Sequence, residues 1–531
     1  MSSVGPDAPR ILVADPLAED GLRRLREGAQ VEVATGLGEE ELCSRIGPFV
    51  GLVVRSETKV TARVIEEGVN LRVIGRAGVG VDNIDVPAAT ARGILVVNAP
   101  TGNTVAAAEH TVALMLALSR NIARGDASLR SGRWDRSKMV GNEMRGKTLG
   151  VVGLGKIGVE VARIAQGLQM QVMAFDPLIS TERAEQLGIS LGSLDEVLTQ
   201  ADVLTVHTPL NDATKGLVGG RELALMPAGA RVLNVGRGGI VDEQALADAV
   251  TSGHLAGAAV DVFTKEPPPP DHPLLQDERI LVTPHLGAST REAQISVATD
   301  VAEQMIDVLN GRPARWAVNA PQVSSEELGL VVPYQELGHR MGRLWAQLGG
   351  GNLKAVEILY QGDVAGVHTA AITAEVVAGM LGQFSHDRVT SVNAMEMAAR
   401  HGVEVREQRS SKAGSFAGSL MLRVEGRGPS LIEGTIVLGE PRIMRLNDLR
   451  IDLLADGSFL FLEHRDRPGL IGEIGQLLGA ANVNIAEMQV GREAPRANAV
   501  TAVKVDDEIP PALIAQLAEV SDVRLVHRVE L

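Results

Sequence analysis

Short runs of aliphatic and β-branched residues recur over the first 100 residues of the chain, and helix-like stretches separate them. The apolar runs cover residues 11–15, 31–35, 51–55, 71–78 and 94–100. Runs of this length between helical segments predict a parallel sheet flanked by helices. The mostly apolar stretch 104–120 predicts one long helix.

A second block of alternating strand and helix signals follows. Its predicted strands, with the turns that end them, are 148–155, 171–176, 202–209, 231–238, 256–263 and 280–285. Each ends in polar or turn-forming residues, and in a doubly wound sheet ligands bind at the carboxyl ends of the strands. A helix is expected next over 289–310. Ser289 and Glu292 fit the S-x-x-E pattern of a helix start, and Gly311 and Pro313 end it.

The last 200 residues have a different pattern. Residues 322–455 predict strands at 355–360, 421–426, 431–439 and 450–454 and a helix at 367–384, and they contain no catalytic motif. The final stretch predicts strand 459–464, helix 470–481, strand 484–490, strand 499–505, helix 512–520 and strand 523–531. This βαββαβ order is typical of a ferredoxin-like unit.

Composition and charge limit the class of protein. The length of 531 residues suggests three or four domains, at about 150 residues each. There are 51 basic and 66 acidic side chains, a net charge of −15, which argues against a nucleic-acid partner. The single cysteine, Cys43, allows no disulfide framework and suggests no metal cluster.

No segment predicts contact with a membrane. The first ten residues, MSSVGPDAPR, lack the apolar core of a signal peptide. The apolar run 112–118 is too short to cross a bilayer. We therefore expect a cytoplasmic protein.

Residues 153–158 read GLGKIG, which matches the dinucleotide-binding pattern G-x-G-x-x-G. The motif alone is weak, but here a strand precedes it and a helix follows it. Gly153 would form the tight turn, Gly155 would let backbone N–H groups approach a pyrophosphate, and Gly158 would let helix and strand pack closely. Asp176 ends the next strand, where it can accept hydrogen bonds from a ribose 2′-hydroxyl and would repel a 2′-phosphate. This predicts NAD rather than NADP.

A histidine follows the last strand of this block. His285 lies in the sequence LVTPHLGAST, between a strand end and a helix start, where a lone histidine is most often a surface or capping residue. Glu266, in FTKEPPPP, is a candidate to orient the imidazole, and otherwise a solvated loop acid. Arg237, in LNVGRGGIVDE, is a candidate to bind a carboxylate and polarise a carbonyl, and otherwise a surface arginine. Together, downstream of a dinucleotide turn, the three residues favour acid–base chemistry.

The motifs GLGKIG with Asp176, NVGRGGIVDE, DVFTKEP and TPHLGAST resemble those of the D-isomer-specific 2-hydroxyacid dehydrogenases, over residues 10–315. The resemblance implies that Arg237, Glu266 and His285 are catalytic, with His285 as the proton donor and acceptor. It implies cofactor contacts from Gly153, Gly155, Lys156, Ile157, Gly158, Asp176, Thr208, Val235, Asp261, His285, Gly287 and Ala288.

Residues near the ends of the first block's strands are candidates to bind substrate. They are Arg55, Ser56, Arg76, Gly78, Asn103 and, from the second block, Arg237. A basic cluster, Arg133, Arg136 and Lys138, is either a substrate-phosphate site or a solvated loop.

The end of the chain resembles an ACT domain, a module that senses small molecules, in EHRDRPGLIGEIGQLLGAANVNI (463–485). His464, Asp466 and Asn484 are candidates to bind an amino-acid effector across a dimer. The whole arrangement resembles the long, ACT-bearing branch of the dehydrogenase family. This implies oxidation of 3-phospho-D-glycerate to 3-phosphohydroxypyruvate, entry into serine synthesis, feedback inhibition by L-serine, and a homo-oligomer, plausibly a tetramer that dimerises through the nucleotide domain.

The expected fold is α/β, with two Rossmann-like doubly wound lobes, a mixed α/β regulatory domain and a ferredoxin-like ACT domain. The expected domains are 1–101 completed by 291–318 (substrate lobe), 102–290 (NAD-binding), 319–455 (intervening) and 456–531 (ACT). Two other functions stay open: a glyoxylate or hydroxypyruvate reductase with a regulatory tail, and a non-catalytic NAD-sensing protein. A pure amino-acid sensor would leave the first 315 residues unexplained.

Overall fold

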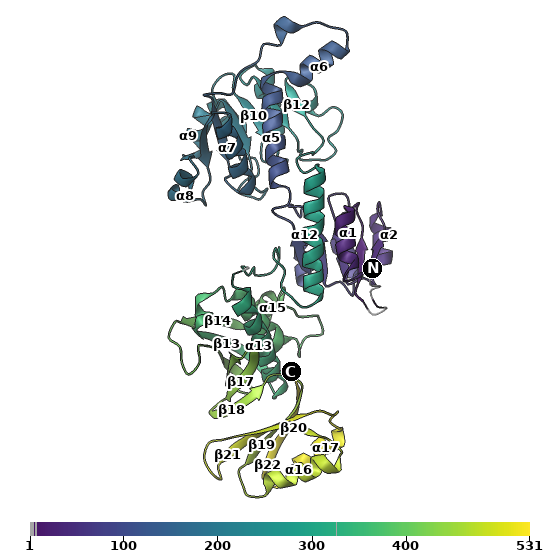
Figure 1. The fold of residues 1–531 in the computed structure, drawn as a ribbon, viewed down its shortest axis with the longest axis vertical. Helices are drawn as coiled ribbons and strands as arrows, with labels where there is room; N and C mark the ends of the chain where they lie inside the picture. The colour runs from purple at the N-terminus through teal and green to yellow at the C-terminus, as the bar shows by residue number, and fades with distance from the viewer. Residues whose placement is uncertain (1–4, 6–7, 325) are drawn as a thin grey trace.

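The strands of the protein form four sheets that follow one another along the chain (Figure 1). The structure is a computed structural model and describes residues 5, 8–324 and 326–531. The α/β class predicted from the sequence is confirmed. Among the described residues no helix is long and apolar enough to cross a membrane.

The first sheet is parallel, with strand order β2-β1-β3-β4-β5. Its strands are β1 (Arg10–Val13), β2 (Gln30–Val33), β3 (Gly51–Val54), β4 (Val73–Arg76) and β5 (Leu95–Asn98). Helices α1 (Glu19–Arg26), α2 (Glu39–Ile46), α3 (Ala62–Glu67) and α4 (Val86–Ala91) connect them. All four residues of β3 are buried, as expected for a central strand that helices cover on both faces. This sheet and its helices are called the first lobe.

The second sheet has the order β12-β11-β10-β9-β6-β7-β8, the doubly wound arrangement of dinucleotide-binding folds. Its strands are β6 (Thr148–Val152), β7 (Gln171–Phe175), β8 (Ser190–Leu191), β9 (Val203–Val206), β10 (Arg231–Asn234), β11 (Gly257–Val260) and β12 (Ile280–Val282). Its helices are α5 (Thr104–Ser119), α6 (Ile122–Arg130), α7 (Lys156–Gly167), α8 (Thr181–Gln186), α9 (Leu194–Gln200), α10 (Gly220–Leu225) and α11 (Glu243–Thr251), with 3₁₀ turns η1 (Arg136–Lys138) and η2 (Pro273–Leu275). The strand order reverses between β6 and β9. This unit is the second lobe.

Helix α12 (Arg291–Leu309) leads the chain from the second lobe back to the first (Figure 1). Val297, Val301 and Met305 on this helix share a core with β1 and β4 of the first lobe. The predicted start is off by one residue: the side chain of Thr290, not Ser289, accepts the hydrogen bond from the backbone N–H of Ala293. Thr290 has the extended backbone that a helix-capping residue needs.

The third sheet is mixed, with order β14-β13-β15-β16-β17-β18. Its strands are β13 (Gly351–Gly362), β14 (Glu404–Ser410), β15 (Gly418–Arg427), β16 (Leu431–Val437), β17 (Glu440–Leu446) and β18 (Leu449–Leu454). Helices α13 (Leu328–Gln347), α14 (Ala370–Leu381) and α15 (Ala394–Arg400), with the turn η3 (Asp363–Gly366), complete this third unit. The sequence pattern did not predict α13, α15, β14 or β17.

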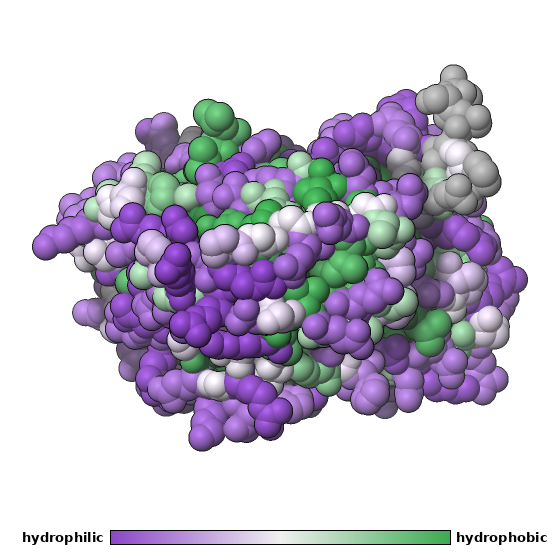
Figure 2. All heavy atoms as spheres, turned by 90° about the horizontal axis from the view of Figure 1, so that it is seen from below, coloured by the Kyte–Doolittle hydropathy of each residue, from purple (hydrophilic) through white to green (hydrophobic). Residues whose placement is uncertain are grey.

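The fourth sheet is antiparallel, with order β20-β21-β19-β22, and confirms the ferredoxin-like prediction. Its elements are β19 (Ser458–Arg465), α16 (Leu470–Ala480), β20 (Ile485–Arg492), β21 (Asn498–Val505), α17 (Pro511–Ala518) and β22 (Val523–Glu530). Figure 2 shows the molecule from below, the end at which this fourth unit lies in Figure 1, with apolar residues in green among mainly polar ones in purple.

The third and fourth units share one hydrophobic core. One face of the fourth sheet is covered by α16 and α17. Phe459, Phe461 and Val529, from its other face, belong to the same cluster as Leu344 of α13 and Ile451 of β18. This core includes residues on both sides of the domain boundary predicted at residue 455. The four predicted domain boundaries stay predictions. Because the interface is a continuous core, the two units should move together.

The third unit is also attached to the first lobe through polar contacts. The side chains of Arg388, Thr390 and Asn393 donate hydrogen bonds to the backbone carbonyls of Leu71, Gly93 and Ala91 at 3.0, 3.1 and 3.3 Å. We call these three side chains the seam. The chain between α12 and α13 is fixed to the first lobe as well, because Asn319 accepts from the N–H of Val96 and donates to the carbonyl of Ile94.

Candidate active site

A cavity of about 950 Å³ lies between the first and second lobes. Most of the predicted catalytic, substrate-binding and cofactor-binding residues line it: Arg55, Ser56, Arg76, Gly78, Asn103, Ile157, Val235, Arg237, Glu266, His285, Gly287 and Ala288. Six neighbouring strands of the second sheet are each followed by predicted site residues. Parallel strands bring such residues to one edge of the sheet. The cleft therefore collects residues that are far apart in the sequence.

His285 and Glu266 are in direct contact. His285 Nδ1 lies 2.8 Å from Glu266 Oε2, and the two side chains are 46% and 39% exposed toward the cleft. Burial raises the pKa of Glu266, but hydrogen bonds from His285 and from the N–H of Phe263 outweigh it, so the pKa lies below its ordinary value. The pair can hold an imidazolium next to a carboxylate.

Asp261 holds the loop that carries His285. Its side chain is fully buried and accepts hydrogen bonds from the N–H groups of Leu286 and Gly287 and from the hydroxyl of Thr283, at 2.7, 2.9 and 2.6 Å. His285 itself has a φ of 55°, in the left-handed region that non-glycine residues seldom adopt. We infer that the Asp261 carboxylate stabilises this conformation. Its predicted contact with the cofactor stays a prediction.

Arg237 reaches from the second lobe toward the first. Its Nε lies 3.4 Å from Asp82 Oδ2. A Cβ added at Gly80 would come within 2.2 Å of the guanidinium, so the absence of a side chain there leaves room for Arg237. A guanidinium at this position lines the same cavity as His285 and can bind a carboxylate.

The guanidinium of Arg76 lines the cleft on the side of the first lobe. Burial and repulsion from Arg237 lower the pKa of Arg76 to about 10. Its Nε is buried and has no hydrogen-bond partner among the described residues. Gly78 is needed beside it, because a Cβ there would overlap the Arg76 side chain and its φ is +155°. With Arg55 and Lys59, these groups give the cleft four basic side chains, suited to a small polyanion.

The turn 153–158 has the geometry that its motif predicts. Gly153 has a φ of +95°, and a Cβ at Gly158 would come within 2.1 Å of the Gly153 carbonyl. A Cβ at Gly155 would meet nothing within 4 Å, so its backbone is open to a ligand. Asp176 follows β7 and accepts hydrogen bonds from the N–H groups of Leu154 and Leu178 at 2.7 and 2.8 Å. A carboxylate has about four acceptor positions, so it can still accept from ribose hydroxyls.

Unpartnered polar atoms also suggest that the site is built for a ligand. Thr208 Oγ1 and Asn103 Oδ1 are buried without a hydrogen-bond partner among the described residues. Buried polar atoms normally have partners, and a bound molecule would supply them. Thr208 packs beside Gly153, whose added Cβ would lie 2.9 Å from the threonine methyl. The open glycine turn, Asp176 and Thr208 together fit a dinucleotide.

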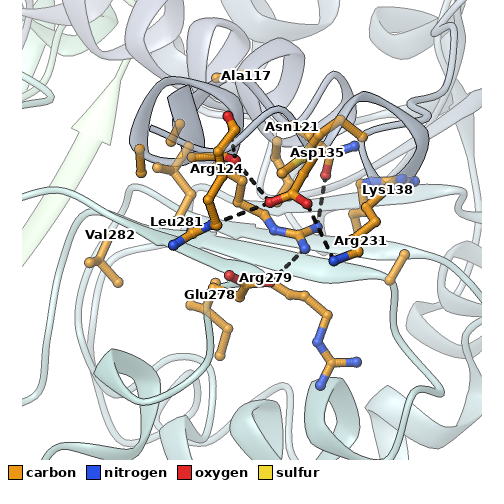
Figure 3. Close-up of a pocket in the computed structure, with 18 residues that line it drawn as sticks. Ala117, Asn121, Arg124, Asp135, Lys138, Arg231, Glu278, Arg279, Leu281 and Val282 are labelled. Atoms are coloured by element: carbon orange, nitrogen blue, oxygen red, sulfur yellow. Dashed lines mark hydrogen bonds and ion pairs between the residues drawn. The ribbon is translucent and has the colours of Figure 1, made fainter. Parts of the chain in front are cut away.

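The basic cluster at 133–138 is not at the cleft. Arg133 and Lys138 line a separate cavity of about 460 Å³. Figure 3 shows this cavity, where Arg124 pairs with Glu278 at 2.6 Å, Lys138 pairs with Asp135 at 3.3 Å, and Arg231 lies close by. Within one chain, the interpretation of this cluster as a substrate-phosphate site is therefore wrong. A local run of charge does not reveal which edge of the fold it occupies.

The predicted effector residues lie at two ends of the fourth sheet. His464 pairs with Ala499 of β21, whereas Ile485, next to Asn484, pairs with Val505 at the far end. Six residues of strand separate these positions on β21, roughly 20 Å at about 3.3 Å per residue. One small amino acid cannot touch all three residues in one chain.

Each of these residues also has partners inside its own unit. His464 Nε2 contacts Thr501 Oγ1 at 2.7 Å, while its Nδ1 is buried without a partner among the described residues. Asp466 accepts from the N–H of Arg496 at 2.9 Å, and Asn484 donates to Asp506 at 2.6 Å. A shared effector site needs a second copy of this unit.

Sequence reasoning missed three charged residues that line the cleft: Lys59, Asp82 and Asp85. Asp85 caps α4, where its side chain accepts a hydrogen bond from the N–H of Ala88. Lys59 lies in the same strand-end loop as Arg55, and that position was the available signal. Asp82, the partner of Arg237, gave no signal, because its contact joins segments 155 residues apart.

Comparison with known proteins gives the family. The chain is 43% identical over 525 residues to D-3-phosphoglycerate dehydrogenase of Synechocystis sp., covering 98% of this chain and 95% of that one. It is 40% identical to the enzyme of the same name from Archaeoglobus fulgidus, over 98% of this chain and all of the relative, and 39% identical to that of Bacillus subtilis, over 98% and 99%. The chain belongs to the D-3-phosphoglycerate dehydrogenase family.

The units of the chain match separate family models. The NAD-binding domain of the D-isomer-specific 2-hydroxyacid dehydrogenases matches residues 112–287. The intervening domain of D-3-phosphoglycerate dehydrogenase matches 330–447, in the third unit, and the ACT domain matches 458–522, in the fourth. The predicted cofactor, NAD, is confirmed at the level of the family.

Solved structures resemble more than half of the chain. A protein from Thermus thermophilus is 38% identical, and the match covers 58% of this chain and 99% of the Thermus protein, with a TM-score of 0.55. An NAD-dependent formate dehydrogenase from Staphylococcus aureus, solved with NAD, is 30% identical over 57% of this chain and 96% of its own, with a TM-score of 0.52.

Proposed function

We propose that the chain catalyses the NAD-dependent oxidation of 3-phospho-D-glycerate to 3-phosphohydroxypyruvate, the first step of L-serine biosynthesis. The observation that carries this proposal is the His285–Glu266 pair at 2.8 Å, in a cleft that Arg237 also lines. The full-length similarity to D-3-phosphoglycerate dehydrogenases supports the choice of substrate.

The catalytic roles follow from the chemistry of the three side chains. Arg237 binds the substrate carboxylate and polarises the oxygen on C2. His285 accepts the proton of the C2 hydroxyl through Nε2, because Nδ1 is engaged with Glu266. Glu266 stabilises the imidazolium that forms. Bound NAD supplies the hydride acceptor for C2, so the alcohol becomes a ketone and one proton remains on His285.

Cofactor and phosphate binding are assigned to groups at the two sides of the cleft. The N–H groups of the 153–158 turn and the start of α7 would bind the diphosphate of NAD. Asp176 would accept from the adenosine ribose and disfavour NADP. Arg55, Ser56, Arg76 and Asn103, on the first lobe's side, would hold the substrate, including its phosphate.

A substrate panel tests the proposal. NADH formation is measured with 3-phospho-D-glycerate, D-glycerate and glycolate, and the reverse reaction with glyoxylate and hydroxypyruvate. The proposal predicts a much higher kcat/KM for the phosphorylated substrate. Equal or higher values for the unphosphorylated acids would favour the glyoxylate or hydroxypyruvate reductase, and no turnover with any of them would favour the NAD-sensing protein.

An ACT domain implies an amino-acid effector, and we propose that this effector is L-serine. His464 and Asp466 of one copy, with Asn484 of a second, would bind its carboxylate and ammonium groups. The shared core and the seam support a route from this site to the first lobe. Activity with and without L-serine tests the identity of the effector, with L-alanine as the matched control.

We also propose that the chain forms a homo-oligomer, plausibly a tetramer, in which one contact joins two second lobes. An arm formed by α6 and the residues after it projects from the second lobe (Figure 1). Trp134 and Val140 on this arm are 80% and 83% exposed, and apolar side chains at such exposure indicate an interface. Light scattering with Trp134→Asp tests it: a smaller species is expected, and an unchanged mass would contradict it. A cytoplasmic location stays a prediction.

A further inference from the structure

Lys156 and Trp316 join the two lobes beside the dinucleotide turn. The Lys156 ammonium lies 4.5 Å from the centroid of the Trp316 ring, in a cation–π contact. Lys156 is the first residue of α7 in the second lobe. Trp316 follows α12, in a segment that returns to the first lobe and pairs with its edge strand β5. The contact therefore spans the two lobes.

The backbone of Trp316 is fixed to the first lobe. Its N–H donates to Gln304 Oε1 at 2.8 Å, and its carbonyl accepts from the N–H of Asn98 at 3.3 Å. Ala317, the next residue, bridges to Val97 of β5. Because the backbone of Trp316 is fixed to the first lobe, the distance of its ring from α7 depends on the spacing between the two lobes.

An acidic group adds to the same environment. Asp300 on α12 pairs with Arg315 through Oδ1 at 2.9 Å, while its Oδ2 is buried without a partner among the described residues. Burial raises the pKa of Asp300, and the nearby charges of Arg315 and Lys156 oppose this. The Lys156 ammonium thus faces an aromatic ring and is attracted by a carboxylate, both on the first lobe's side.

We propose that Trp316 is a positioning residue: its ring holds the Lys156 ammonium at the start of α7, where it pairs with the cofactor's diphosphate. This rests on the proposed function, which puts the diphosphate at this helix end. A lysine side chain is long and flexible, and holding it in place before the cofactor arrives lowers the entropic cost of binding. The same contact makes cofactor binding sensitive to the spacing of the two lobes.

A double-mutant cycle on NAD affinity tests this role. The dissociation constant of NAD is measured by calorimetry, without turnover, for wild type, Trp316→Leu, Lys156→Met and the double variant. We expect Trp316→Leu to weaken NAD binding about three- to tenfold, the range of a partly desolvated cation–π contact. In the Lys156→Met background the same substitution should have no further effect.

Three outcomes would overturn the proposal. The first is an unchanged NAD affinity in Trp316→Leu. The second is the same loss with and without Lys156, which would show that Trp316 acts through the fold and not through the lysine. Trp316→Phe retains a weaker aromatic face, and a loss equal to that of Trp316→Leu would also contradict the role. If the wild-type chain does not bind NAD, the proposed function itself fails, which is a separate result.

Discussion

Replacing Glu266 by glutamine should slow the reaction. Glu266 Oε2 lies 2.8 Å from His285 Nδ1, and an amide oxygen can keep this hydrogen bond while the negative charge is lost. The amide nitrogen then faces the N–H of Phe263, so the hydrogen bond that Oε1 accepts there is lost. A hydrogen bond to a charged group contributes about 1.5–3 kcal/mol and a neutral one about 1 kcal/mol. The difference is about 0.5–2 kcal/mol, and because the side chains are 39% and 46% exposed, solvent screening excludes its upper end. We take about 1.4 kcal/mol, a tenfold decrease in kcat.

The pH profile gives a second readout for the same variant. The pKa of Glu266 lies below its ordinary value of about 4.3. The carboxylate is therefore charged over the whole pH range of the assay. The tenfold difference should therefore persist from about pH 6 to about pH 9.

A matched control is available in another unit. His339 Nδ1 lies 3.0 Å from Glu375 Oε2, so Glu375→Gln makes the same chemical change in a histidine–glutamate pair of the third unit. NADH formation should be unchanged in this control. If Glu266→Gln keeps kcat within about twofold of wild type over the whole pH range, Glu266 does not stabilise a charged His285 in the rate-limiting step.

Three further predictions concern the loop, the substrate and regulation. Asp261→Asn should lower stability by about 1–3 kcal/mol at neutral pH, because it removes a buried acceptor of several hydrogen bonds. The pKa of Asp261 is lower in the folded protein than in the unfolded chain, where it is about 3.9. Its carboxylate therefore stabilises the fold at a pH above about 3.9, and this contribution is lost as the pH falls through the pKa of the folded state. Thermal unfolding at several pH values checks the loss of stability and its pH dependence. An unchanged Tm in Asp261→Asn would show that this carboxylate does not stabilise the loop. Arg237→Met should reduce kcat/KM for 3-phospho-D-glycerate by about 100-fold or more, the effect of two charge-assisted hydrogen bonds. Its NAD affinity, measured by calorimetry, should stay within about twofold, and an intact kcat/KM would exclude Arg237 as the carboxylate ligand. The double variant Arg388→Met, Thr390→Val should weaken inhibition by L-serine, while serine binding and the activity without serine stay unchanged. Undiminished inhibition would show that the seam does not transmit the effect of serine. Arg400→Met, an exposed position on α15, is the control.

Local signals were sufficient to predict most of the cleft. Each candidate follows a short apolar strand, and the rule that ligands bind at the carboxyl edge of a doubly wound sheet brought Arg237 and His285 together without any distance information. Gly153 and Gly158 could be assigned because a left-handed turn and a close backbone contact both exclude side chains.

Features that depend on long-range packing could not be predicted. Asp261, which follows β11, holds the His285 loop through hydrogen bonds to the segment after β12, and the seam joins residues about 300 positions apart. Strand β14 has a single apolar residue, Val405, so its pairing with β13, not a hydrophobic pattern, defines it. Helix α13 buries Tyr334, Leu337 and Met341 at helical spacing, but it also contains Pro333, a residue that disfavours the interior of a helix.

The most direct test of the proposed chemistry is the rate of NADH formation from 3-phospho-D-glycerate by His285→Gln, with NAD binding measured on the same sample. A general base contributes about 10²–10⁴-fold, so the variant should be at least about 100-fold slower than wild type while it still binds NAD. A His285→Gln enzyme that binds NAD and oxidises the substrate at close to the wild-type rate would contradict the central role of this histidine.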